Sequence, residues 1–214
     1  REALSLGLEP GRISIVGDRA DELGAALVEA VAGADICFVS GGLGPTHDDR
    51  TVELVAAAAG VPLTVDEELR ARIEVISRSI AERLSRPFAD FAAGIVKQAT
   101  IPAGATVLGP AGTAPGLVLR AGECVVVVLP GPPGELQSLW PAALATDLLA
   151  SVLARARRPR RRVLKLFGVS ESAVAEALRR AGGDGDGVEV TIWNQPFRVV
   201  GVIAGTSWTS AGAV

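Results

Sequence analysis

Apolar residues and turn-forming residues alternate along the first 155 positions in a way that predicts a succession of strands and helices. Short apolar runs bounded by glycine, proline or aspartate predict strands over residues 13–16, 35–40, 106–108, 116–119 and 124–129. Apolar residues spaced three and four positions apart predict helices over residues 21–31, 49–59, 66–84 and 135–153. Residues 85–104 show neither period, so we expect them to be irregular. The alternation predicts a three-layer, doubly wound α/β domain with a mostly parallel sheet.

Two of these strands are followed by loops rich in glycine. The runs 35–40 and 124–129 are apolar on both faces, as strands of a parallel sheet are when helices cover both sides. In a doubly wound sheet, ligands bind outside the carboxyl ends of the strands. The loops over residues 41–48 and 130–134 are therefore the first places to look for chemistry.

Composition changes at residues 155–162, where six of eight residues are arginine. We predict one α/β domain over residues 1–155, an arginine-rich linker over 156–162, a small βαββ appendage over 163–205 and a tail over 206–214. Within the appendage, the pattern predicts strands over 163–167, 188–193 and 199–203 and a helix over 170–180. Clustered arginines can neutralise phosphates. The glycine-rich turn of the appendage lacks the basic residue of a KH loop, however, so the pattern does not favour a nucleic-acid partner.

Composition narrows the class of protein further. The chain has 214 residues, of which 49% are hydrophobic, and a net charge of −3, so it is not a generally basic nucleic-acid binder. Because no apolar run reaches the roughly 18 residues of a membrane span, we expect no membrane partner and a cytoplasmic location. Cys37 and Cys124 lie in apolar strands and are expected as buried thiols. The apolar surplus leads us to expect a homo-oligomer of undetermined size.

The stretch from Ser40 to Thr51 carries the strongest signal for ligand binding. Gly41, Gly42 and Gly44 have no Cβ, which lets the backbone approach an anion closely. The predicted helix that follows directs the positive end of its dipole toward that anion. This arrangement is typical of a phosphate site, although the loop matches neither the P-loop nor the dinucleotide-binding pattern.

Asp48 and Asp49 would repel a phosphate unless a cation lay between them. We therefore predict that both carboxylates are catalytic and bind a divalent metal ion of unknown identity. The alternative is that one carboxylate merely caps the helix, and the two interpretations are compatible. His47 is the only histidine, which excludes a multi-histidine metal site.

Two further loops are candidate walls of the same site, because glycine opens them and proline stiffens them. The candidate ligand-binding residues are Gly112, Thr113 and Gly116 in the first loop, and Pro130, Gly131 and Glu135 in the second. The alternative for either loop is an ordinary tight turn. Thr46 and Thr51 are candidates for hydroxyl contacts to the ligand or to metal-bound water.

Five motifs occur in a fixed order along the chain. They are Val16-Gly17-Asp18, Ser-Gly-Gly-Leu-Gly-Pro-Thr-x-Asp-Asp-x-Thr at 40–51, Lys97-Gln98-Ala99, Gly112-Thr113-Ala114-Pro115-Gly116 and Leu129-Pro130-Gly131-x-Pro-x-Glu. Together they resemble the N-terminal region of the competence/damage-inducible CinA family, within the MoaB/MogA-like molybdopterin-binding superfamily. The resemblance spans residues 1–155, and residues 163–204 resemble the βαββ subdomain that follows in CinA-like proteins.

The resemblance implies a metal-dependent hydrolase that acts on pyrophosphate bonds, with ADP-ribose as the expected substrate. It places Asp49 at the family's aspartate, with Thr51 in register. A molybdopterin-binding or adenylyltransferase-like protein is the alternative, and a non-catalytic ligand-binding module is the third. In each case the partner is a nucleotide or pterin small molecule. The family's opening strand is expected before Arg1, and its C-terminal amidase domain is not in this sequence, so we predict no deamidation.

Overall fold

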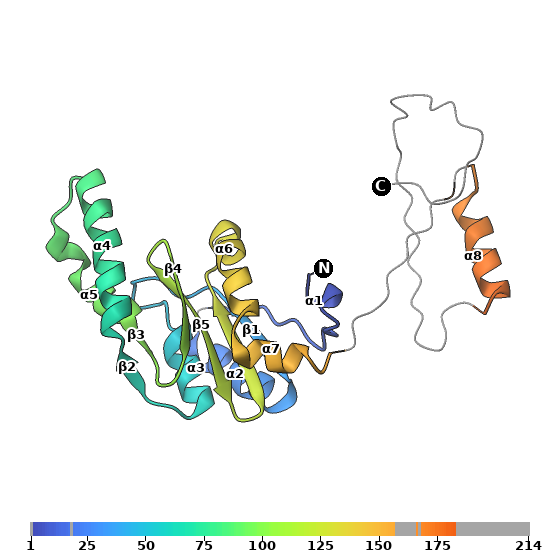
Figure 1. Cartoon of the computed structure of the whole chain (residues 1–214), viewed down its shortest axis with the longest axis horizontal. Helices are drawn as coiled ribbons and strands as arrows, with labels where there is room; N and C mark the ends of the chain where they lie inside the picture. Colours follow the sequence, from blue (N-terminus) through green and yellow to red (C-terminus); the bar gives the residue numbers. More distant parts are fainter. Residues whose placement is uncertain (1, 18, 157–165, 167, 183–214) are drawn as a thin grey trace. The chain divides into compact units, whose positions relative to one another are not determined.

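The computed structural model describes residues 2–17, 19–156, 166 and 168–182 (Figure 1). The chain divides into two units after residue 159, and each is described by itself. In the second unit, α8 (Glu171–Arg180) confirms the predicted helix, and Ser170 caps it by accepting a hydrogen bond from Ala173 N at 3.3 Å. Apart from residue 166, which is described alone, the predicted strands of the appendage and the tail lie outside the described residues.

A four-stranded sheet in the order β1-β6-β5-β4 forms the centre of the first unit (Figure 1). Its strands are β1 (Ile36–Ser40), β4 (Thr106–Ala111), β5 (Ala114–Ala121) and β6 (Cys124–Leu129). β1 pairs in parallel with β6, whereas β5 pairs antiparallel with both β6 and β4. Strands β1, β6 and β4 therefore run in one direction and β5 alone runs in the other.

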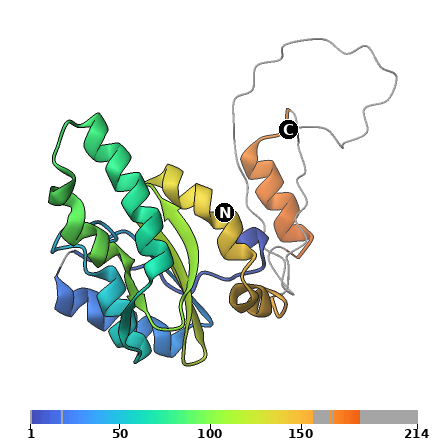
Figure 2. The same ribbon diagram turned by 60° about the vertical axis from the view of Figure 1, so that its left-hand side comes forward.

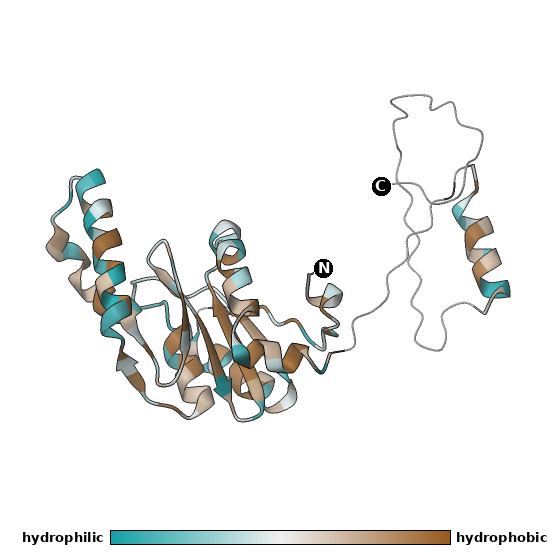
Figure 3. Cartoon of the chain, in the orientation of Figure 1, coloured by the Kyte–Doolittle hydropathy of each residue, from teal (hydrophilic) through white to brown (hydrophobic). Residues whose placement is uncertain are grey.

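Helices cover both faces of this sheet, which gives the three layers that the sequence predicts (Figure 2). One face carries α2 (Ala20–Gly33), α3 (Thr51–Ala59), α4 (Glu67–Arg83) and α5 (Ala92–Ala99), and the other carries α6 (Pro133–Leu144) and α7 (Asp147–Leu153). Along β6, Val126 and Val128 pack toward the first group and Val125 and Val127 toward the second. Burial of each side chain contributes about 1.5–3 kcal/mol. Figure 3 shows apolar residues concentrated on the central strands.

The predicted strand over residues 13–16 is wrong. After the short helix α1 (Glu2–Ser5), these residues form no strand and lie without regular structure. Their apolar side chains stay exposed, with 85% of Ile13 and 97% of Ile15 accessible to solvent. The alternation of apolar residues indicates a capacity for strand formation, but a strand also needs a neighbour with which to pair.

The predicted irregular region over residues 85–104 is also wrong. It contains a 3-10 helix η1 (Phe88–Phe91), α5 and β3 (Thr100–Pro102), which pairs antiparallel with β2 (Leu63–Val65) in a separate two-stranded sheet. The helical period escaped detection because α5 has only eight residues. This segment is important for the site, since α5 ends beside the glycine-rich loop.

The predicted helix over residues 135–153 is divided into α6 and α7, which are bent by 77° at a short break. Thr146 begins α7, because its hydroxyl accepts a hydrogen bond from Leu149 N at 3.4 Å. No single helix among the described residues is long and apolar enough to cross a membrane, and only α6 and α7 taken together across their bend have that length and composition.

Candidate functional site

The loops that follow β1 and β6 are held together at the carboxyl edge of the sheet. The N–H of Gly41 donates to the carbonyl of Leu129 at 3.1 Å, and Ser40 Oγ donates to the carbonyl of Pro130 at 3.1 Å. A Cβ added to Gly131 would lie 3.5 Å from Gly41 Cα, so glycines form the contact between the loops. The structure thus brings together two of the three loops that the sequence singles out.

The turn between β4 and β5 reaches the same edge, since β5 begins beside the end of β6. Gly112 has a positive φ of 61°, and a Cβ there would lie 3.3 Å from Glu135 Oε1. Gly116 is instead buried under α6, where a Cβ would lie 2.7 Å from Leu139 Cδ1. Gly112 and Glu135 therefore meet, whereas Gly116 provides room for helix packing. The predicted contact of Gly116 with a ligand stays a prediction. The same holds for Thr113, which is half-buried.

A cavity of about 190 Å³ opens beside the loop over residues 41–48. Its lining comes from that loop and the first turn of α3, from the end of α5, and from the starts of β2, β3 and β5. The lining residues are Gly42, Leu43, Gly44, Asp49, Val52, Glu53, Leu63, Lys97, Gln98, Thr100 and Pro115. Pockets for whole small molecules usually measure about 300–1,000 Å³, so this cavity suits one phosphate-sized part of a ligand.

A larger hollow of about 550 Å³ lies between β4 and the α6–α7 bend. It includes Thr106, the first residue of β4, which lies at the amino edge of the parallel strands. None of the predicted site residues lines it. We therefore place the candidate site at the smaller cavity.

Asp49 closes the loop on itself. Its Oδ2 accepts hydrogen bonds from Thr46 N at 3.0 Å and from Thr46 Oγ1 at 2.6 Å, and the same hydroxyl lies 2.5 Å from Asp48 Oδ1. Because a threonine hydroxyl has one proton, it serves one carboxylate at a time. The helix begins at Thr51 with Arg50 as its N-cap and no side-chain cap. The alternative that an aspartate caps α3 is therefore wrong.

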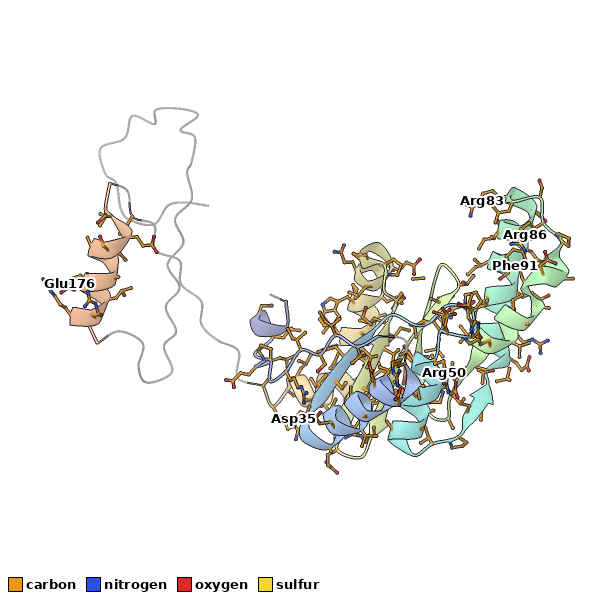
Figure 4. The ribbon with its side chains drawn as sticks, turned by 180° about the vertical axis from the view of Figure 1, so that it is seen from behind. Asp35, Arg50, Arg83, Arg86, Phe91 and Glu176 are labelled. Carbon is orange, nitrogen blue, oxygen red and sulfur yellow. The ribbon has the colours of Figure 1, made fainter. Side chains whose placement is uncertain are left out.

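Arg50, labelled in Figure 4, marks the start of α3. Its guanidinium pairs with Glu53 at 3.0 Å, one turn further along the helix. This pair lowers the pKa of Glu53, mainly through the hydrogen bond from Arg50. Glu53 therefore brings a further negative charge to the wall of the cavity.

Both aspartates are ionised at neutral pH. The hydrogen bond from Thr46 lowers the pKa of Asp48. Partial burial acts to raise the pKa of Asp49, but hydrogen bonds from Thr46 and Gly44, with the charge of Lys97, outweigh it and the pKa is lowered. Two adjacent carboxylates fit a Mg²⁺-like ion, which proteins hold through one or two carboxylates together with substrate phosphates. Within the described ranges, no group of three or more His, Cys, Asp or Glu residues is placed to hold a metal.

Two glycines of the loop are required by close packing. A Cβ on Gly44 would lie 2.4 Å from Asp49 Oδ2, and a Cβ on Gly42 would lie 2.3 Å from Thr51 Oγ1. Thr51 is only 4% exposed, so the structure gives it a packing role against Gly42. Its predicted contact with a ligand stays a prediction.

Lys97 is a site residue to which the sequence assigned no role. Its ammonium donates to the backbone carbonyls of Gly44 at 3.3 Å, of Asp49 at 2.6 Å and of Thr46. The lysine therefore stands inside the curve of the loop that carries both carboxylates. Only its place in one of the five ordered motifs marked it.

Gln98 supports the loop from the next position along α5. It is 7% exposed, and its Nε2 donates to the carbonyl of Leu43 at 2.9 Å. A buried amide needs such a partner, because an unsatisfied one costs free energy. The end of α5 thus fixes the glycine-rich loop at several backbone positions.

A three-layer α/β domain with a glycine-rich loop at the carboxyl edge of its sheet belongs to the class of α/β domains that bind small-molecule ligands at this edge. Residues 1–150 match the family described as "Probable molybdopterin binding domain". The chain belongs to this family, and the matched region contains every predicted site residue.

CinA-like proteins are among its relatives. The one from Mycolicibacterium vanbaalenii is 45% identical over 193 residues, which cover 88% of this chain and 46% of that protein. The one from Mycobacterium leprae is 44% identical over 180 residues, covering 83% and 42%. A crystal structure of CinA from Thermoplasma acidophilum, described as a protein of unknown function, has a TM-score of 0.55 at 34% identity and covers 69% of this chain and 84% of that one. The chain spans less than half the length of these CinA-like proteins.

Proposed function

We propose that this domain binds the phosphate of a nucleotide at the glycine-rich loop and hydrolyses a pyrophosphate bond, with ADP-ribose as the substrate. The observation that carries the proposal is the joint lining of one cavity by Gly42, Gly44 and the ionised Asp49. Membership of a molybdopterin-binding family supports the ligand class, because molybdopterin is itself a phosphate-bearing small molecule. The CinA-like relatives support the choice of this branch of the family.

The roles of the residues follow from their positions. A Cβ at Gly41 would meet open space, and the main chain at Gly42 and Gly44 lines the cavity that would take the phosphate. Asp48, which is exposed, and Asp49, which is half-buried, would hold a divalent ion through their oxygens. Such an ion, when bound, polarises a phosphoryl oxygen and activates water. Thr46 orients Asp49 through its N–H, and its hydroxyl donates to either Asp49 or Asp48.

A second candidate is a molybdopterin-binding, adenylyltransferase-like protein, which the description of the family favours. The same loop would then hold the phosphate of the pterin. The two candidates differ in the reaction and share the residues. A panel of nucleoside diphosphate compounds and purified molybdopterin, read by AMP release and by calorimetry, separates them. Tight molybdopterin binding without cleavage of any panel member would favour the second candidate and end the hydrolase proposal.

Asp49→Asn tests the role of the carboxylate. The asparagine carbonyl still accepts from Thr46 N, so we expect the fold and melting temperature to persist. Loss of the charge should reduce Mg²⁺- or Mn²⁺-dependent release of AMP from ADP-ribose by about 100-fold or more. Glu74→Gln is the matched control, since Glu74 lies on α4 and pairs with Arg78 on the same helix. Wild-type turnover by Asp49→Asn would remove this residue from the mechanism.

A further inference from the structure

Lys97 places a positive charge in a ring of backbone oxygens. An ammonium group has three protons, and three loop carbonyls, those of Gly44, Thr46 and Asp49, accept them. No carboxylate lies within ion-pairing distance of Lys97 among the described residues. A cation surrounded by peptide carbonyls resembles the way in which proteins hold K⁺ or Ca²⁺. The lysine therefore occupies the place that a bound ion takes in such sites.

The lysine also sets the direction of the peptide groups in the loop. In a trans peptide the carbonyl and the following N–H point to opposite sides, and the described chain contains no cis peptide. Because the carbonyls of Thr46 and Asp49 point toward Lys97, the N–H groups of His47 and Arg50 point away from it. These carbonyl oxygens, which carry partial negative charge, therefore lie on the side of the loop that faces Lys97. The two N–H groups, which carry partial positive charge, point to the other side.

The charge of Lys97 reaches the carboxylates through space. It helps to lower the pKa values of Asp48, Asp49 and Glu53, although hydrogen bonds are the larger favourable cause in each case. The Lys97 ammonium therefore fixes the shape of the loop through hydrogen bonds, and its electrostatic field favours the ionised form of the carboxylates. Neither action requires contact with a ligand.

We propose that Lys97 serves as a built-in monovalent cation of the glycine-rich loop, a positioning residue that holds Gly44–Asp49 in its ligand-binding shape. What the loop binds rests on the proposed function, whereas the claim about its shape does not. Without the ammonium, the three carbonyl oxygens face an empty space of the size of a small cation. An ammonium ion from solution can then enter and restore the hydrogen bonds.

Hydrogen exchange of the 214-residue chain tests this proposal without any ligand. We compare the peptide over residues 41–51 in wild type, Lys97→Ala and Lys97→Met, in tetramethylammonium chloride and in ammonium chloride at equal ionic strength. In tetramethylammonium, which cannot donate, loop exchange in both variants should be about tenfold faster or more, because charge-assisted hydrogen bonds are lost. Ammonium should slow exchange in Lys97→Ala only, since the methionine side chain fills the space. The peptide over residues 124–129 is the internal control.

Two results would overturn the proposal. One is wild-type loop exchange in both variants, and the other is fast exchange in Lys97→Ala that ammonium does not slow. If Lys97→Ala fails to fold, Lys97→Met decides, because it keeps the aliphatic stem: fast exchange confined to the loop supports the proposal and wild-type exchange overturns it. Since no substrate is present, this outcome stands apart from the Asp49→Asn test.

Discussion

Among single residues, Asp49 has a structural role in the loop and a proposed role in binding an ion. Its Oδ2 accepts both hydrogen bonds from Thr46 and so fixes the loop. On the proposed function, the same carboxylate would also bind the divalent ion. A carboxylate that is already oriented loses less freedom on binding a ligand. If the proposed ion binds there, Thr46 would contribute to metal affinity without touching the metal.

Gly44→Ala should destabilise the fold, because its Cβ would lie 2.4 Å from Asp49 Oδ2 and 2.9 Å from Asp49 Cγ. We expect a loss of about 1–3 kcal/mol in the free energy of unfolding, the usual cost of overpacking. Chemical denaturation measures it. Gly24→Ala is the control, since its nearest neighbour atom is 3.8 Å away and alanine suits the interior of α2. That variant should gain about 0.5–1 kcal/mol. Equal stability of the two variants would contradict the packing argument.

The two aspartates predict how the loop responds to acid. Their folded pKa values lie below the ordinary value of 3.8, so their contribution to stability is complete above that pH. It is lost as the pH falls through the lower folded pKa values. Carboxyl carbon NMR shifts of Asp48 and Asp49 should therefore titrate with midpoints below 3.8. Thr46→Val should move both midpoints upward, because it removes the hydroxyl donor. Midpoints at or above 3.8 in wild type would exclude this role of Thr46.

The site could be predicted from sequence only where one stretch of chain carries the signal. Gly41, Gly44 and the two aspartates lie within nine residues and show their chemistry together. Lys97 and Gln98 are about fifty residues away from the loop they support, and they contact its backbone. Backbone acceptors are the same in every residue, so the loop sequence has no feature that indicates these partners.

At the scale of elements, the break between α6 and α7 depends on Thr146. Its hydroxyl donates to Ala143 O at 2.8 Å and accepts from Leu149 N, thereby ending one helix and starting the next. Thr146→Ala should cost about 1 kcal/mol of unfolding free energy, the usual value of an N-cap. Ser151→Ala, which alters an exposed hydroxyl bonded to Leu148 O within α7, should change it by less than about 0.5 kcal/mol. Urea denaturation compares them, and equal effects would show that the cap is not what stabilises α7.

Elements were predicted well where their pattern was long and their partners were present. β6, with six buried residues, and α4, with seventeen residues, match the predicted positions closely. The period was too short to detect in α5. For residues 13–16 the local pattern was correct for a strand, but strand formation depends on pairing with a neighbour, which local sequence does not specify.

For the whole molecule, the α/β class could be predicted from the order of the elements in the sequence. The antiparallel direction of β5 relative to β4 and β6 could not. The apolar runs of β5 and β6 are alike, and only the short turn over residues 122–123 makes them antiparallel. The homo-oligomer and the cytoplasmic location stay predictions.

The bonds from Gly41 to Leu129 and from Ser40 to Pro130 have a consequence for ligand affinity. These hydrogen bonds join two loops that are almost ninety positions apart in the chain, so the two loops move together. A molecule that orders one of these loops on binding therefore orders the other as well, and the entropic cost of ordering both loops arises only once. Chemical groups at opposite ends of that molecule should consequently reinforce each other, binding more tightly when joined than the sum of the separate fragments would suggest.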